Sequence, residues 1–197
     1  MPKINNIIAS INTSVAAALS TEAFQSGIFY NQIVELIPVT DKDEFRPAMI
    51  DNDGEGTPVI IDDTLPFQIY HRLKSFSHES VPAGQDSFGD AGDFIKETAN
   101  MVMIVISDRS RIRMRGEDFL SVIAANIPVE FLNTFLTPLN LINASTEIES
   151  TNTDKEEVWK GEYNTAYMLK PNGIMYALNY KIITIFSKQC FPVCEVD

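Results

Sequence analysis

The sequence predicts a single α+β domain in which an N-terminal helix and a central helix pack on a mixed, mainly antiparallel sheet. Two observations predict this class: one apolar stripe recurs at helical spacing near the N-terminus, and several segments rich in β-branched and aromatic residues have the length of strands. The chain has 197 residues, 45% of them hydrophobic, enough to bury a sizeable core in one domain.

The N-terminal helix is predicted from apolar residues spaced three or four apart. They form one face of a helix, while Asn5, Asn6, Asn12 and Thr13 lie away from it. The same polar residues interrupt the apolar centre that a secretory signal needs, so we expect a helix of the mature protein and a cytosolic origin. We expect the stripe to pack on the protein's own sheet. Its members are Ile4, Ile7, Ile8, Ile11, Val15 and Leu19.

Three strands are predicted upstream of the central helix, at residues 27–39, 67–74 and 98–106. The last is the most apolar run in the chain and should lie in the middle of the sheet. The segment 40–66 between the first two is acidic and rich in turn residues, with a short apolar burst at 59–61. We expect long exposed loops at about 75–93 and 144–157, because both are rich in polar residues.

The central helix should begin near Gly116, where Glu117 and Asp118 suit the positive end of a helix, and should stop at Pro128. Its apolar face comprises Phe119, Leu120, Ile123 and Ile127. Downstream, residues 163–169 and 174–186 flank the turn sequence Lys-Pro-Asn-Gly at 170–173, which predicts a β-hairpin. In the second arm, alternate residues from Ile174 to Phe186 form one apolar face.

The charge is strongly acidic, with a formal net charge of -12. This argues against general nucleic-acid binding and against docking on anionic membranes. Residues 98–115 form the one basic island, with four arginines and one acid. If this segment is a strand, Arg109, Arg111, Arg113 and Arg115 project from one face, and if it is a loop the alternation has no geometric meaning. We expect these arginines to form salt bridges with carboxylates of this chain or of an adjacent copy, with nucleic-acid contact and plain solvation as the alternatives.

One acidic turn resembles a calcium-binding loop in its spacing. With Asp51 as the first position, Asp53, Glu55 and Asp62 fall at the third, fifth and twelfth. Asp62 is shorter than the glutamate usual at the twelfth position, and Pro58 lies where a small sheet would pair. A flexible acidic turn is therefore the favoured interpretation, with a calcium site as the alternative.

No other group of residues predicts catalysis, a metal or a cofactor. His71 and His78 have no neighbouring Cys, Ser or acid at the spacing of a triad or a metal motif; we expect His71 on a strand face and His78 in the long loop. The two cysteines, Cys190 and Cys194, cannot close a four-ligand zinc site alone, although they could pair with each other. We therefore expect a protein that is not an enzyme and has no cofactor.

The order of elements resembles the neck proteins of tailed bacteriophages, such as head–tail connector, tail-completion and tail-terminator proteins. The residues behind the resemblance are Ile4–Leu19, Asn100–Ile127 and Tyr163–Phe186. The Asn-rich and Ile-rich composition is similar to that of crAss-like phages of gut Bacteroidales. The resemblance implies a virion protein, made in the host cytoplasm, whose copies repeat around an axis and contact portal or tail subunits. DNA would pass through the ring without specific binding.

Two hypotheses of different class follow. The first is a structural virion subunit that forms a ring through protein–protein contacts. The second is a small protein- or calcium-binding module acting through residues 51–62. An enzyme of an unrecognised family is the third and least favoured hypothesis. The sequence sets neither the ring size nor the neighbouring proteins.

Overall fold

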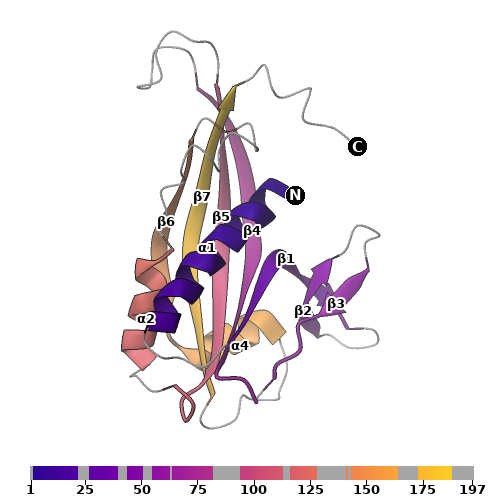
Figure 1. Cartoon of the computed structure of the whole chain (residues 1–197). Coiled ribbons are helices and arrows are strands. Elements are labelled where there is room, and N and C mark those ends of the chain that lie inside the picture. Colours follow the sequence, from indigo (N-terminus) through magenta and orange to yellow (C-terminus); the bar gives the residue numbers. More distant parts are fainter. Residues whose placement is uncertain are drawn as a thin grey trace.

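The computed structural model is built around one seven-stranded sheet with the strand order β3-β2-β1-β4-β5-β7-β6 (Figure 1). It describes residues 2–21, 27–39, 44–50, 55–62, 64–81, 94–112, 116–127, 141, 143–163 and 173–187. All neighbouring strands are antiparallel except β1 and β4, which are parallel. The predicted α+β class, with a mainly antiparallel sheet and an N-terminal helix, is confirmed. The strands are β1 (Ile28–Pro38), β2 (Phe45–Ile50), β3 (Gly56–Pro58), β4 (Phe67–Val81), β5 (Phe94–Asp108), β6 (Asn143–Asn152) and β7 (Gly173–Ser187), and the described helices are α1 (Pro2–Thr21), α2 (Gly116–Ala125) and α4 (Lys155–Tyr163).

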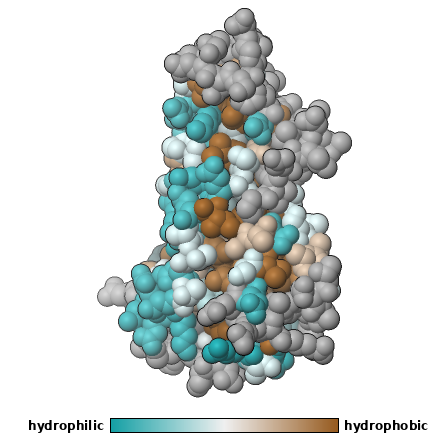
Figure 2. Space-filling model, turned by 90° about the vertical axis from the view of Figure 1, so that its left-hand side faces the viewer, coloured by the Kyte–Doolittle hydropathy of each residue, from teal (hydrophilic) through white to brown (hydrophobic). Residues whose placement is uncertain are grey.

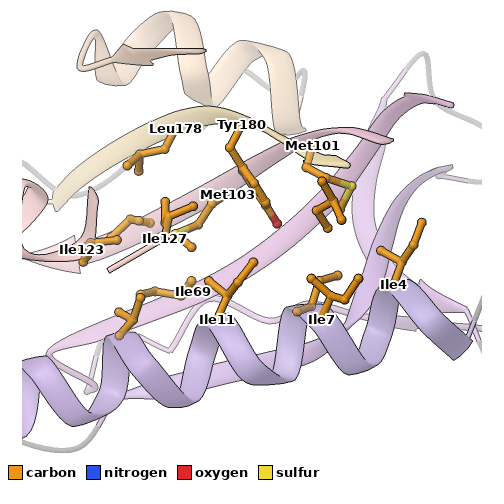
Figure 3. Close-up of a cluster of buried hydrophobic side chains, with 14 of the residues drawn as sticks. Ile4, Ile7, Ile11, Ile69, Met101, Met103, Ile123, Ile127, Leu178 and Tyr180 are labelled. Atoms are coloured by element: carbon orange, nitrogen blue, oxygen red, sulfur yellow. The ribbon is translucent and has the colours of Figure 1, made fainter. Parts of the chain in front are cut away.

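Helix α1 lies across one face of the sheet and buries its apolar stripe against it (Figures 1 and 3). All six residues of the predicted stripe are at least nine-tenths buried. Their neighbours include Ile69 of β4, Met101 and Met103 of β5, and Tyr180 of β7. The expectation that this helix packs on its own sheet is confirmed. Two asparagines expected outside the stripe also take part: Asn12 is buried, and the Oδ1 atom of Asn5 accepts a hydrogen bond from the backbone N–H of Ile33 at 3.0 Å.

Strand β5 is the central strand that its apolar run predicts. It pairs with β4 on one side and with β7 on the other over nearly its whole length. Its alternate residues enter two separate cores because both faces of the sheet are covered. Met103 and Val105 face α1 and α2, whereas Ile104 and Ile106 join a second core on the opposite face. Helix α4 lies over that second face, to which it contributes Val158 and Tyr163 (Figure 1).

Helix α2 and strand β7 also follow their sequence patterns. The four predicted apolar residues of α2 are buried beside α1. In β7 the predicted face from Tyr176 to Phe186 joins the same core. The predicted hairpin of 163–169 with 174–186 is corrected in part. Its second arm lies within β7, but Tyr163 ends α4 and does not begin a strand. Residues 164–172 lie outside the described residues, and from Ala177 to Ile185 β7 is paired with β5 on one side and β6 on the other.

The prediction of loops at 75–93 and 144–157 is wrong for most of the residues in these ranges that the structure describes. Residues 75–81 continue β4, residues 144–152 belong to β6, and α4 begins at Lys155. These strands bury little on either face, so their sequences are polar and lack the alternating apolar residues that would predict a strand. Their structure comes from pairing instead: β5 supports the end of β4, and β7 supports β6. The expected acidic turns at 40–66 also contain the two short strands β2 and β3. Residues 82–93 lie outside the described residues.

Candidate interaction surface

A buried polar cluster joins α1 to the sheet around His71. The ring nitrogen Nδ1 lies 2.7 Å from the hydroxyl of Tyr180, and Nε2 lies 2.8 Å from Oδ1 of Asn12. The amide nitrogen of Asn12 donates both its hydrogens, to the carbonyl of Tyr30 and to Oδ1 of Asn31. Oδ1 of Asn12 must therefore accept, so Nε2 of His71 carries the proton and Nδ1 accepts from Tyr180. The hydrogen-bond pattern thus fixes the tautomer of the histidine.

Burial keeps this cluster uncharged. Desolvation lowers the pKa of His71 to about 3, and it raises the pKa of Tyr180 above its ordinary value. With both ring nitrogens hydrogen-bonded and no exposed surface, His71 is held neutral near pH 7. The expected position of His71 on a strand face is confirmed, and its partners there serve the packing of α1.

The opposite face of the sheet holds a second polar cluster around Glu162 of α4. Arg72 Nε donates to both carboxylate oxygens at 3.1 Å, and Nη2 donates to Oε1 at 2.6 Å. The hydroxyl of Tyr70 lies 3.3 Å from Oε2. The side chain of Glu162 is 4% exposed and that of Arg72 is 21% exposed. Burial raises the pKa of Glu162, while the nearby Arg72 opposes that rise. This ion pair anchors α4 to β4.

A capping pattern positions α4 and could have revealed it in the sequence. Asp154 precedes the helix, and its Oδ1 accepts hydrogen bonds from the backbone N–H groups of Glu156 and Glu157 at 3.0 and 3.2 Å. An Asp followed three residues later by a Glu is a signature of a helix start. The aromatic side chains of Trp159 and Tyr163 then stack one turn apart, with ring centroids 4.3 Å from each other.

The structure describes two of the four candidate calcium ligands, Glu55 and Asp62. Asp51 and Asp53 lie outside the described residues, whereas Glu55 and Asp62 are exposed. Oδ1 of Asp62 accepts hydrogen bonds from the backbone N–H and the hydroxyl of Thr64, at 2.8 and 2.6 Å. These bonds lower the pKa of Asp62 and close a local turn. Across the ranges that the structure covers, no group of three or more His, Cys, Asp or Glu side chains could hold a metal ion.

The arginine row does not form a strand where the structure describes it. Arg109 and Arg111 lie in a turn after β5, so the alternation that would align four guanidinium groups is absent there. Arg111 donates to the backbone carbonyl of Thr64 at 2.6 Å and forms an ion pair with Asp108 at 3.6 Å. Part of the expected salt bridging is therefore within the chain. Arg113 and Arg115 lie outside the described residues.

No protein-family model and no curated protein matches this chain. No described helix is both long and apolar enough to cross a membrane. The arrangement of its exposed residues is therefore the main guide to how the molecule acts.

Among the described helices and strands, the second half of β4 contains the longest run of exposed residues. Seven consecutive residues, Lys74–Ser80, are exposed, so both faces of the strand are open to solvent there. Phe76 is 37% exposed and packs edge-on against His78, which pairs with Glu97 of β5 at 3.3 Å. The expectation that His78 lies in a loop is thus wrong, because its segment is held in the sheet by β5.

A second exposed apolar residue, Ile60, stands on a rigid support. Its side chain is 72% exposed just after β3. The buried amide of Gln68 holds the segment from both ends: Nε2 donates to the carbonyl of Ile60 at 2.9 Å, and Oε1 accepts from the N–H of Asp62 at 2.8 Å. These two hydrogen bonds fix the backbone on which the exposed Ile60 side chain stands.

Proposed function

We propose that this protein is a non-enzymatic structural subunit of a virion, forming a ring in the neck or tail of a tailed bacteriophage through protein–protein contacts. The observation that carries the proposal is the exposed run of β4 from Lys74 to Ser80, a stretch of regular strand whose two faces contribute little to the chain's own core. Ordered strand that buries little in its own chain is typical of a surface used by a neighbour.

The buried polar groups support the same proposal. The side chains that most resemble catalytic groups, His71 and Glu162, are each held by partners within the chain. Each fastens a helix to the sheet, one on either face. Their chemistry is used to hold the fold, which leaves the surface to carry the function.

The charge distribution fits a subunit of such a ring. Its copies would contact one another head to tail. A net charge of -12 would keep a DNA strand from adhering to an acidic lumen. Arg109 and its neighbours in the basic island would meet acidic surface of an adjacent copy or of a portal or tail subunit. The protein would be made in the host cytoplasm and would end in the virion.

Native mass measurement over a range of protein concentrations, with negative-stain images of the same samples, tests this proposal. We expect a closed oligomer or a concentration-dependent rise toward one. An Arg109→Glu variant should assemble less than the wild type while retaining its unfolding midpoint, because Arg111, which contacts Thr64 and Asp108 within the chain, is left unchanged. A strictly monomeric wild type at every concentration would argue against self-driven ring formation.

A further inference from the structure

We propose that neighbouring copies of this chain join by strand addition, with the exposed edge of β4 from one copy pairing antiparallel with β6 of the next. This inference rests on the proposed function and names the surfaces that would form the ring. The occupant of the β4 edge is a second copy, because the same molecule carries a complementary strand edge at the other end of its sheet.

The β4 edge is available beyond the point where β1 ends its pairing. The described β1–β4 ladder stops at Arg72, whereas β4 continues to Val81 alongside β5. Within the described part of the chain, no strand lies on the other side of this segment, and in Figure 1 this half of β4 extends past β1. Its backbone therefore presents a row of hydrogen-bonding groups suited to a further strand.

The complementary edge belongs to β6, the last strand in the sheet order. It is ten residues long and contains no proline. Figure 2 shows the side of the molecule seen from the left of Figure 1, where β6 and α2 lie; hydrophilic and hydrophobic groups lie next to each other on its coloured part. The other outer strand, β3, has only three residues and includes Pro58, which cannot donate to a ladder. Of the two outer strands, β6 is thus the one able to accept a partner.

Strand direction makes the pairing antiparallel. The last four strands of the sheet order are β4-β5-β7-β6, and each neighbouring pair among them is antiparallel. With four alternating strands, β6 runs opposite to β4. A second copy placed beside the first by rotation about an axis along the strands would therefore continue the alternation without a break. Such a contact is head to tail, and it closes into a ring when the rotation between copies closes.

The strand pairings define which residues of the two edges are level with each other. Ser75 of β4 lies in the same row as Glu147 of β6, because Ser75 pairs with Asn100, Asn100 pairs with Lys181, and Lys181 pairs with Glu147. In a ring without axial displacement, Ser75 of one copy would face Glu147 of the next. The neighbouring Lys74 donates from Nζ to Oδ1 of Asn179 within its own chain, at 2.5 Å. Strand β6 carries two acids and no basic residue.

Glu79, the one acidic residue of the exposed β4 segment Lys74–Ser80, does not face another acidic residue at this register. Glu79 lies level with Asn143, through Lys96 and Ile185, and so would face an amide. A neutral or attractive contact is expected along the whole pairing.

Disulfide trapping tests the pairing directly. Ser77 and Ser145 lie in one row, through Thr98 and Ile183, so they would be opposite each other between copies. Within one copy they are three strand spacings apart, about 14 Å, which is beyond the roughly 7 Å limit of a disulfide. The two natural cysteines are first replaced, as Cys190→Ser/Cys194→Ser. In this background Ser77→Cys and Ser145→Cys are purified separately, mixed and oxidised.

We expect the mixture to give a cross-linked pair that contains one copy of each variant. Neither variant alone should cross-link efficiently. Efficient homodimers of Ser77→Cys alone would show symmetric β4–β4 pairing and overturn the proposal. The absence of a mixed pair from a sample that native mass shows to be assembled would overturn it too, while leaving the proposed function in place. A strictly monomeric wild type would refute both self-assembly and this interface.

A charge series supplies the matched control. Ser75→Glu should weaken assembly at least tenfold by facing Glu147, whereas Ser75→Lys at the same position should not weaken it. Adding Glu147→Lys to Ser75→Glu should restore assembly, because the two charges are then opposite. If the Glu and Lys variants at position 75 assemble equally, the level register is wrong. Unfolding midpoints of each variant verify that the monomer stays folded.

Discussion

One buried side chain, His71, should make the stability of this protein depend on pH. It is fully buried, and burial lowers its pKa to about 3, whereas an unfolded histidine titrates near 6.5. The unfolded chain therefore binds a proton below pH 6.5 that the folded chain refuses. The stabilisation from a neutral His71 is complete above pH 6.5 and is lost progressively as the pH falls from there toward 3.

The size of the loss follows from the two pKa values. At pH 5 the unfolded histidine is almost fully protonated and the folded one almost fully neutral. One pKa unit corresponds to about 1.4 kcal/mol, so the wild type should lose about 2 kcal/mol between pH 8 and pH 5 through this group. The variant His71→Gln lacks the titrating ring. It should be less stable than the wild type at pH 8, because it disturbs the bonds to Asn12 and Tyr180, and its deficit should shrink by about 2 kcal/mol at pH 5.

Urea unfolding of both proteins at a series of pH values measures this difference. Comparison of the two curves cancels the contribution of Glu162, whose raised pKa acts in the opposite direction by favouring the folded state as the pH falls. His78→Gln is the matched control, since it removes the only other histidine, at a half-exposed position. A deficit of His71→Gln that stays constant from pH 8 to pH 5 would refute the reasoning.

Three further predictions concern packing and charge. Arg72→Met leaves Glu162 charged and buried, so it should cost about 3–5 kcal/mol relative to the wild type at pH 8, and this deficit should shrink as the pH falls through the raised pKa of Glu162. A deficit relative to the wild type that stays constant at low pH, measured by urea unfolding, would contradict this. Ile11→Ala removes a fully buried side chain between α1 and the sheet and should cost about 2–5 kcal/mol in the same assay, so a loss below about 1 kcal/mol would show that the helix repacks. A Cβ at Gly27 would lie 2.2 Å from the buried ring of Phe67, so Gly27→Ala should lower the thermal midpoint by an amount equivalent to about 1–3 kcal/mol. Gly161→Ala in α4 is its control, because nothing lies within 4 Å there and alanine favours a helix by up to about 1 kcal/mol; equal shifts for both variants would contradict the steric argument.

Part of the candidate surface was predictable from the sequence, and part was not. The basic island at Arg109–Arg115 was visible as a charge pattern, but its geometry depends on where β5 ends, and the described arginines fall in a turn. The exposed edge of β4 was missed because Lys74–Ser80 bury no continuous face and so leave no alternating pattern. The partners of Glu162 were also invisible, since Arg72 lies 90 residues away in the chain.

The sequence alone determined the elements whose apolar residues form a helical stripe, an alternating face or an unbroken run: α1, α2, the inner face of β7 and the central strand β5, which is buried on both faces. In each, the periodicity of apolar residues reports the side that leaves water, and the hydrophobic effect enforces it locally. Only the tertiary structure decided that the polar segments 75–81 and 143–152 are strands, because their order comes from hydrogen bonds to β5 and β7. It likewise brought His71 to Tyr180, 109 residues further along, since contacts across a sheet depend on strand order and register.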